Sequence, residues 1–407
     1  MAGLLCCYSC WYQAALTLFA MAEFPLYRAA FSGLLAMLVG IGIARFGYAP
    51  LIPALIAAHW FNASAAFWLG AMNFLGYVLG ALGMRSWRRA IHTRSLVVGL
   101  MAVTAFCLLA SAWNAGVVYA AIWRLLSGIT GGALMVLMGA AVVGRAPADK
   151  RGQVGGITFA GMGTGMTVSS LLIPRLLQFG LSETWVILGL LSLLLTCIVA
   201  YLMPAATIAP AVALPGTRSF TKPIVFLLIG YALCAIGFVP HVLFLSSFVA
   251  IALGRGVAAG AGVTAVLGVA AAFGPPILGR LADRFGFLTT LAAGYFVMAI
   301  AVALPVFSTN VFVLALSAAG VGAVALGAVV LTSGALAMML PPNRLAATWG
   351  LATMAYAVMQ AASAAGFSTL FHITASYRLL FAVGAIATFI TAICILVSRS
   401  LDVDQQG

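Results

Sequence analysis

Apolar runs longer than about 18 residues recur along almost all of this 407-residue chain, and they constrain its fold more than any other feature. A helix of that length crosses the hydrocarbon core of a bilayer. Hydrophobic residues make up 65% of the chain and charged residues only 6%, which leaves too little polar surface for a soluble protein. A β-barrel would show segments of about ten residues with alternating polarity instead. The sequence therefore predicts an all-α integral membrane protein.

Charged or Pro/Gly-rich breaks separate twelve such runs along the chain. We expect membrane spans near residues 29–57, 64–84, 95–113, 117–144, 153–174, 184–204, 223–250, 257–278, 288–308, 311–339, 346–371 and 377–397. The longest break, 205–222, is rich in Pro and Gly and is interpreted as a cytoplasmic linker. It divides the chain into one six-helix half at 23–204 and a second at 223–398, followed by a cytoplasmic tail at 399–407.

A short internal repeat supports two related halves. The element Gly47-Tyr48-Ala49-Pro50 in the first span recurs 190 residues later as Gly237-Phe238-Val239-Pro240 in the seventh. Two six-helix halves joined on the cytoplasmic side are typical of a large class of secondary transporters.

Residues 1–22 form an uncharged apolar stretch before the first predicted span. The stretch is long enough for a thirteenth span, and it lacks the positive region with which a signal peptide begins. We interpret it as an upstream extension that is not part of the functional chain, which would then begin at Met21.

The basic residues are distributed very unequally between the two sides of the predicted bundle. The net charge is +13, but the charges lie in short breaks between apolar runs, so a nucleic-acid surface is not expected. One side collects fourteen of the 19 Lys and Arg and the other only three, namely Arg175, Arg255 and Arg378. Because positive charge marks the cytoplasmic side, we expect an inner-membrane protein with both termini in the cytoplasm.

The loop after the eighth span carries a recognisable motif. It reads Gly279-Arg280-Leu281-Ala282-Asp283-Arg284-Phe285-Gly286 and resembles the signature GxLADRxG of the major facilitator superfamily. The resemblance implies that Gly279, Asp283, Arg284 and Gly286 form a cytoplasmic gate, whose ion pairs hold the outward-open state. A solvated basic loop is the alternative. The equivalent loop of the first half, 83–89, has no acidic residue.

Three further segments extend the resemblance. Arg124-Leu125-Leu126-Ser127-Gly128-Ile129-Thr130-Gly131-Gly132 is similar to the helix-four signature RxxxGxxxG, whose Arg the family links to proton coupling or substrate binding. The segments 42–53 and 73–81 look like the YbfB-like branch of the superfamily. The implied fold has twelve transmembrane helices in two pseudo-symmetric six-helix halves, and the implied activity is transport of a small solute by alternating access.

Arg45 and Arg124 are the two charges that fall well inside predicted spans, away from their ends. A guanidinium in hydrocarbon costs at least a few kcal/mol, so each must face a cavity, a partner or a ligand. All six Asp and Glu fall in predicted tails or loops, which leaves no internal carboxylate to pair with the arginines. We therefore predict that they bind an organic anion. The alternative is that they bond backbone carbonyls.

Several polar and aromatic residues are candidates to complete such a site. Tyr48, Asn73 and Tyr77 are predicted to contact the substrate, and the spans also offer Trp68, Tyr356 and Gln360. His241 is the only His well inside a span, and it is a candidate for proton coupling or a hydrogen-bonded packing residue.

The predicted function is secondary active transport of a small organic anion. Multidrug efflux is an alternative, because 16 Met and 25 Phe can line a compliant pocket. A membrane receptor would carry a soluble domain, and a membrane enzyme would carry clustered catalytic groups, so both rank lower. We expect no catalytic residue, metal or cofactor. The expected partners are the bilayer, the substrate and a coupling proton or counter-anion, with a monomeric protein.

Overall fold

The computed structural model describes residues 26–85, 91–147, 150–205, 207–208 and 221–406 of the chain. The predicted extension at 1–22 therefore lies outside the described residues. Eleven helices among these residues are long and apolar enough to cross a membrane. A further long helix, α13 (Pro342–Thr374), is less apolar because it carries buried polar side chains, Gln360 among them. Together they confirm the all-α, twelve-helix architecture.

The first half contains six spans. Its first span, Leu26–Ala57, includes a π-helical segment η1 (Leu38–Phe46) and the helix α2 (Tyr48–Ala57). The following spans are α3 (Ala63–Arg85), α4 (Thr93–Ala110), α5 (Val117–Met138) continued by η2 (Gly139–Val143), α6 (Arg151–Leu176) and α7 (Leu181–Leu202). These bounds agree with the predicted spans to within a few residues.

The second half repeats this arrangement. Its first span consists of α8 (Lys222–Val239), η3 (Pro240–Phe244), α9 (Leu245–Ser247) and η4 (Phe248–Ala252). The others are α10 (Gly256–Phe285), α11 (Phe287–Phe307), α12 (Val311–Met339), α13 and α14 (Tyr377–Gln406). The last helix continues through most of the segment predicted as a tail, because Arg399 and Asp402 are compatible with a helix that leaves the bilayer. Two short strands, β1 (Ile91–His92) and β2 (Thr207–Ile208), pair antiparallel and join the first half to the segment before α8.

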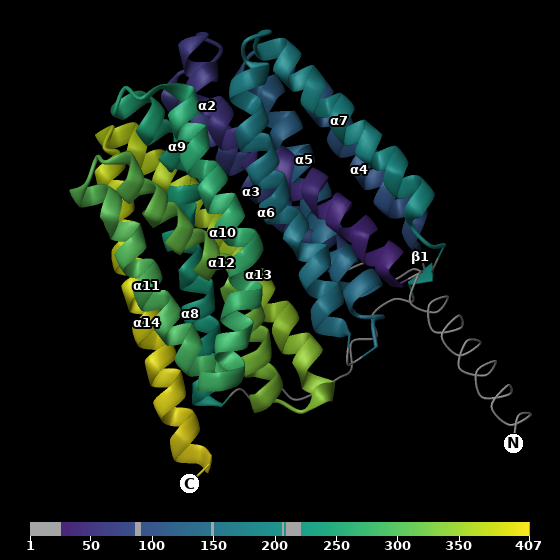
Figure 1. Cartoon of the computed structure of the whole chain (residues 1–407), viewed down its shortest axis with the longest axis vertical. Helices are drawn as coiled ribbons and strands as arrows, with labels where there is room; N and C mark the ends of the chain where they lie inside the picture. The colour runs from purple at the N-terminus through teal and green to yellow at the C-terminus, as the bar shows by residue number, and fades with distance from the viewer. Residues whose placement is uncertain (1–25, 86–90, 148–149, 206, 209–220, 407) are drawn as a thin grey trace, which may run out of the picture.

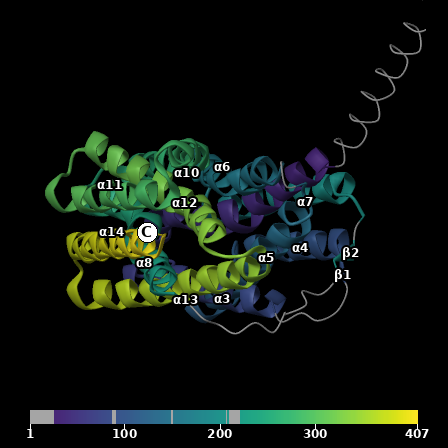
Figure 2. The same ribbon diagram turned by 90° about the horizontal axis from the view of Figure 1, so that it is seen from below.

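The two halves stand side by side (Figures 1 and 2). Successive spans run antiparallel, so both described ends of the chain lie on one face of the bundle, which we call the termini face. The opposite face, which we call the far face, holds the connections at 58–62 and 375–376. Seen from below, α3 lies beside α13 and α6 beside α10, and these two pairs connect the halves.

Proline interrupts the first span of each half, as the repeated motif suggests. Pro50 has no N–H to donate to the carbonyl one turn before it, and the preceding turn widens so that Gly47 N donates to Gly42 O at 3.1 Å. In the second half the π-helical segment η3 begins at Pro240. Both interruptions lie next to the boundary between the halves.

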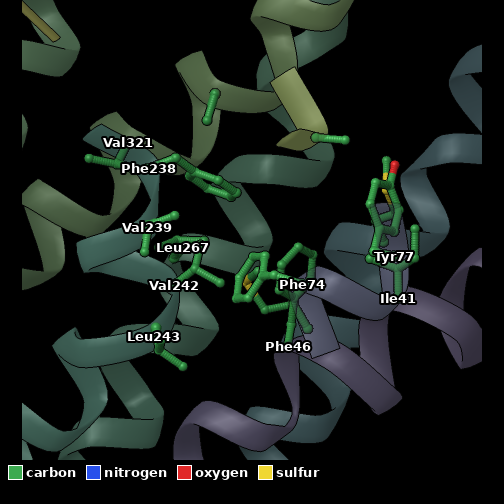
Figure 3. Close-up of a cluster of buried hydrophobic side chains, with 14 of the residues drawn as sticks. Ile41, Phe46, Phe74, Tyr77, Phe238, Val239, Val242, Leu243, Leu267 and Val321 are labelled. Atoms are coloured by element: carbon green, nitrogen blue, oxygen red, sulfur yellow. The ribbon is translucent and has the colours of Figure 1, made fainter. Parts of the chain in front are cut away.

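An apolar core continues across that boundary. Figure 3 shows Phe46 and Phe74 of the first half directed toward Val242 and Leu267 of the second. The rings of Phe46 and Phe238 meet edge to face at 6.4 Å between centroids. The buried site residues described next lie beside this core.

Candidate functional site

Arg45 lies at the end of η1, in a setting made of aromatic rings and one amide. Its guanidinium carbon is 4.0 Å from the ring centroid of Phe74 and 4.7 Å from that of Tyr77. Its Nη2 donates a hydrogen bond to Oε1 of Gln360, which belongs to α13 in the other half. The side chain is only 7% exposed, and its Nε has no hydrogen-bond partner. Arg45 therefore links the two halves through a neutral acceptor.

Arg124 lies in α5 and has different neighbours. Its Nη1 donates to the carbonyl oxygen of Ala44 at 2.6 Å, and its guanidinium carbon lies 4.0 Å from the ring centroid of Tyr48. The side chain is 4% exposed, and Nε again has no partner. The hydrogen bond to Ala44 matches the predicted alternative of a backbone partner, but it uses only one of the five guanidinium protons.

The structure brings the two arginines together through the backbone. Ala44, which accepts from Arg124, directly precedes Arg45 in the chain, so the guanidinium of Arg124 ends beside the backbone from which the Arg45 side chain starts. Their surroundings nevertheless share no ring: Arg45 is turned toward α13, and Arg124 lies against Tyr48. The two arginines therefore have separate surroundings and do not face each other across one pocket.

The side chains of Asn73 and Tyr48 form hydrogen bonds that hold together the helices around the two arginines. Asn73 Nδ2 donates to the carbonyl of Arg124 at 3.1 Å and to Ser127 Oγ at 2.9 Å, which ties α3 to α5. The hydroxyl of Tyr48 donates to the carbonyl of Ala66 at 2.9 Å. Asn73 Oδ1 is buried without a partner. Of the residues predicted to contact substrate, Tyr77 lies on Arg45, Tyr48 lies on Arg124, and Asn73 holds the helix that carries Arg124.

Within the part of the chain that the structure describes, no carboxylate pairs with either arginine. The described acidic residues Glu183, Asp283, Asp402 and Asp404 all lie in the terminal turns of helices. The aromatic faces offset part of the cost of burying the charges, since each cation–π contact contributes about 0.5 to 2 kcal/mol. No other group among the described residues neutralises the positive charge.

The second half contributes Gln360 and Tyr356, which the sequence offered as candidate ligand contacts, and Trp349, which it did not single out. Tyr356 lies one turn before Gln360 on α13, and its ring packs on Tyr231 at 5.1 Å between centroids. Trp349 packs on the same Tyr231 at 5.7 Å. Phe74, which also stacks on Arg45, could have been found from its spacing, because it lies three residues before Tyr77 on one face of α3. No local signal connects Gln360 to Arg45, which is 315 residues away.

His241 lies inside the second half. Its Nε2 is 2.7 Å from Ser317 Oγ, and that hydroxyl donates to the carbonyl of Ala301 at 2.6 Å. Because Ser317 gives its only proton to Ala301, His241 Nε2 acts as the donor in this arrangement. Nδ1 is buried without a partner, and Phe381 packs edge-on at 5.3 Å. This geometry is that of a hydrogen-bonded packing residue, and the proton-coupling role stays a prediction.

The predicted gate lies at the termini-face end of α10. Asp283 and Arg284 are exposed, and Asp283 forms no ion pair with any described residue. Gly286 ends the helix with a φ of 86°, a conformation that favours glycine, and its N–H donates to Ala282 O at 2.8 Å. The role of these residues as a gate stays a prediction.

The far face is closed between the halves by an aromatic cluster. Phe67 of α3 contacts Phe244, Phe371 and Tyr377 of the second half, with ring centroids 4.3, 4.8 and 6.1 Å apart. Phe67 is fully buried in this cluster, which we call the far-face plug. Arg45 and Gln360 lie farther from the far face than this plug, because each is several turns from the far-face end of its span.

Comparison with known families gives a match over most of the chain. The model of a family described as the uncharacterised MFS-type transporter YbfB matches residues 37–396. No curated protein matches the chain significantly.

Two solved structures share the fold. The crystal structure of a point mutant of the nucleoside transporter NupG superimposes with a TM-score of 0.71 and 12% identity, covering 90% of this chain and 99% of that one. A bacterial homologue of the human lysosomal transporter Spinster, in an inward-facing and unoccupied conformation, gives a TM-score of 0.64 and 14% identity. It covers 93% of this chain and 96% of that chain. At these identities the similarity concerns the fold alone.

Proposed function

This chain belongs to the major facilitator superfamily, in the family of uncharacterised YbfB-type transporters, and we propose that it moves a small organic anion across the membrane by alternating access. Its family makes it a transporter rather than an enzyme. The observation that carries the substrate class is Arg45, a buried guanidinium that meets only aromatic faces and the neutral amide of Gln360.

An anion is a better partner for Arg45 than the amide it now contacts. A carboxylate carries a full opposite charge and can accept two parallel N–H bonds from a guanidinium, whereas the amide oxygen is neutral and accepts one here. A carboxylate could therefore compete with Gln360 for Nη2 and also take up the free Nε. Tyr77 and Phe74 would enclose the rest of the substrate, since their rings already flank the guanidinium.

The hydrogen bond between Arg45 and Gln360 connects anion binding to the relative placement of the two halves. Arg45 and Gln360 lie on opposite halves, so an anion that replaces Gln360 removes one contact between them. A ligand shifts a conformational equilibrium only if it binds the two states differently. The Arg45–Gln360 bond provides such a difference.

We assign the termini face to the cytoplasm of the inner membrane and the structure to an inward-facing state. The charges of Arg94, Arg145, Lys222, Arg344 and Arg399 on the termini face support the orientation. The closed far-face plug supports the state, and so does the exposed Asp283, which forms no ion pair with the described residues. In the superfamily pattern this acid pairs when the cytoplasmic side is closed.

The test is thermal unfolding of the purified protein with a panel of organic anions, cations and neutral solutes, a nucleoside among them. A ligand of the folded state at 100 times its Kd adds about 2.7 kcal/mol to its stability. We expect stabilisation by organic anions, and a loss of about a hundredfold in affinity in Arg45→Ala. Arg344→Ala, which removes an exposed arginine on the termini face, is the matched control.

The same variants reconstituted in proteoliposomes report on transport. Saturable anion uptake should disappear in Arg45→Ala and persist in Arg344→Ala. Anion uptake that is unchanged in Arg45→Ala would overturn the proposed site. Stabilisation by apolar cations alone would favour the drug-efflux alternative.

A further inference from the structure

Three tyrosines from both halves lie near the bond between Arg45 and Gln360. The ring centroid of Tyr77 in α3 is 4.7 Å from the guanidinium carbon of Arg45. Tyr356 lies one turn before Gln360 on α13, and residues four apart share a face of a helix, so both side chains leave α13 on one side. Tyr231 of α8 packs on Tyr356, with ring centroids 5.1 Å apart. Both halves therefore supply phenol rings to the surroundings of one guanidinium.

The hydroxyls of these tyrosines have no hydrogen-bond partner among the described residues. The buried hydroxyl of Tyr48, by contrast, donates to the carbonyl of Ala66. Those of Tyr77, Tyr231 and Tyr356 make no hydrogen bond within the described part of the chain. A buried phenol ordinarily has a partner, either in the protein or in a bound molecule. These three hydroxyls are therefore available to a ligand.

The three hydroxyls also lie close to the charge. Tyr77 and Tyr356 both interact electrostatically with Arg45. Tyr231 interacts in the same way with Tyr77 and Tyr356. A few convergent polar groups within aromatic walls are typical of sites for small organic ligands. The free donors of Arg45 and the phenol hydroxyls form such a group.

The exposure of these side chains indicates a small ligand that enters from the termini face. Arg45 and Tyr77 are only 7% and 8% exposed. Along α13, Gln360 is 3% exposed, whereas Tyr356 and Trp349, which lie nearer the termini face, are half-buried. Exposure therefore increases from Arg45 toward the termini face. A ligand of a few heavy atoms is the size that so narrow a site admits.

One carboxylate with a hydroxyl beside it matches these groups. The carboxylate takes Nη2 and Nε of Arg45, and its hydroxyl then meets neutral phenol hydroxyls, which can both donate and accept. An alkyl group in the same place would leave the phenols without a partner. A second carboxylate would require a second cation, and the other buried arginine, Arg124, is directed to Ala44 and Tyr48. The arrangement therefore favours a monocarboxylate.

We propose that the Arg45 site selects a small 2-hydroxy monocarboxylate, whose hydroxyl is recognised by Tyr77 and Tyr356, while Tyr231 holds the ring of Tyr356 in place. This substrate class rests on the proposed function, because its carboxylate is the anion that binds Arg45 there. The phenol hydroxyls distinguish it from other organic anions of the same charge and size.

The test compares lactate with propionate, which has the same carbon chain and charge but no hydroxyl. Calorimetric titration of the full-length protein in lipid nanodiscs gives the Kd of each anion. A site that hydrogen-bonds a ligand hydroxyl rejects the analogue that lacks it. We expect lactate to bind about tenfold more tightly than propionate. Both anions should lose about a hundredfold in affinity in Arg45→Ala.

Two variants remove one hydroxyl each and keep the ring. Tyr356→Phe and Tyr77→Phe should each weaken lactate binding about fivefold and leave propionate binding unchanged. A merely structural role of the rings would not separate the two anions in this way. Tyr201→Phe is the matched control, because Tyr201 is 78% exposed at the end of α7, and it should bind both anions as wild type does. Thermal unfolding confirms that each variant is folded.

The outcomes separate this substrate class from the proposed function. Equal affinity of wild type for lactate and propionate, with both lost in Arg45→Ala, would overturn the hydroxyl preference and leave the proposed function intact. A lactate preference that survives in the double variant Tyr77→Phe/Tyr356→Phe would overturn the assigned residues. Failure of both anions to bind, while other organic anions stabilise the protein through Arg45, would overturn the 2-hydroxy class alone. Absence of stabilisation by any organic anion would overturn the proposed function and the substrate class with it.

Discussion

At the scale of single residues, Gln360 explains how a buried arginine can exist without an acid. An amide oxygen satisfies one donor of Arg45 but does not cancel its charge, so the site keeps a positive potential. A glutamate at the same position would cancel that potential permanently. In the proposed function, this neutral partner is the feature that leaves Arg45 available to an external anion.

Gln360→Glu should accordingly close the site to anions. The new carboxylate would pair with Arg45 in nearly the same geometry, and an anion would have to displace a charged group rather than an amide. We expect anion affinity, measured by thermal stabilisation, to fall about thirtyfold or more. Gln360→Met, which keeps the length but removes the acceptor, should bind anions at least as tightly as wild type. Equal anion affinity in the Glu and Met variants would refute the role of this contact.

The sequence identified the two arginines but not their partners. Arg45 and Arg124 are found from sequence because a charge inside an apolar run is costly and needs a reason. Gln360 and Phe74 were not predicted to bind Arg45, since nothing in the chain fixes how the halves are placed against each other. The pairing with Gln360 arises only when α13 packs beside α3.

At the scale of elements, the glycines of α6 allow neighbouring helices to pack closely against it. A Cβ on Gly165 would lie 2.7 Å from the Cα of Gly42 in the first span, and one on Gly163 would lie 2.7 Å from the backbone N of Ala272 in α10. Small residues such as glycine let helices approach closely in membrane proteins. The structure shows in addition that Gly163 forms a contact between the halves.

Gly163→Ala should therefore destabilise the protein, whereas Gly156→Ala should not. The added methyl group at position 163 meets backbone atoms of α10, which cannot move aside without separating the helices, and overpacking of this kind costs about 1 to 3 kcal/mol. At Gly156 nothing lies within 4 Å, so the same substitution gains helix propensity at no steric cost. Thermal unfolding of both variants is the measurement. A midpoint for Gly163→Ala at or above that of Gly156→Ala would contradict the tight contact.

At the scale of the whole molecule, the far-face plug and the Arg45–Gln360 bond lie one behind the other along the boundary between the halves. Phe67 is the only described residue of the first half whose ring forms part of the plug. Its partners all belong to the second half. Removal of this one ring should loosen the closure without touching either arginine.

Cysteine labelling in intact cells tests both the orientation and the closure. In a cysteine-free background, Thr374→Cys lies exposed on the far face and should react with a membrane-impermeant maleimide. Val242→Cys, buried behind the plug, should react about tenfold faster when combined with Phe67→Ala, because the aromatic seal is then incomplete. Labelling of Thr374→Cys only after permeabilisation would reverse the assigned orientation. Equal labelling of Val242→Cys with and without Phe67→Ala would show that Phe67 does not seal this face.

The sequence by itself determined the class of this protein. The length and repetition of the apolar runs predict twelve spans in two halves, and the motif at Gly279 to Gly286 is similar to that of the major facilitators, because both signals are local in the chain. The tertiary structure decided what surrounds each buried charge. It placed Gln360 on Arg45, and it placed Arg124 against Tyr48 and the carbonyl of Ala44 in its own half. These contacts join spans far apart in the chain, and helix periodicity contains no information about which spans meet.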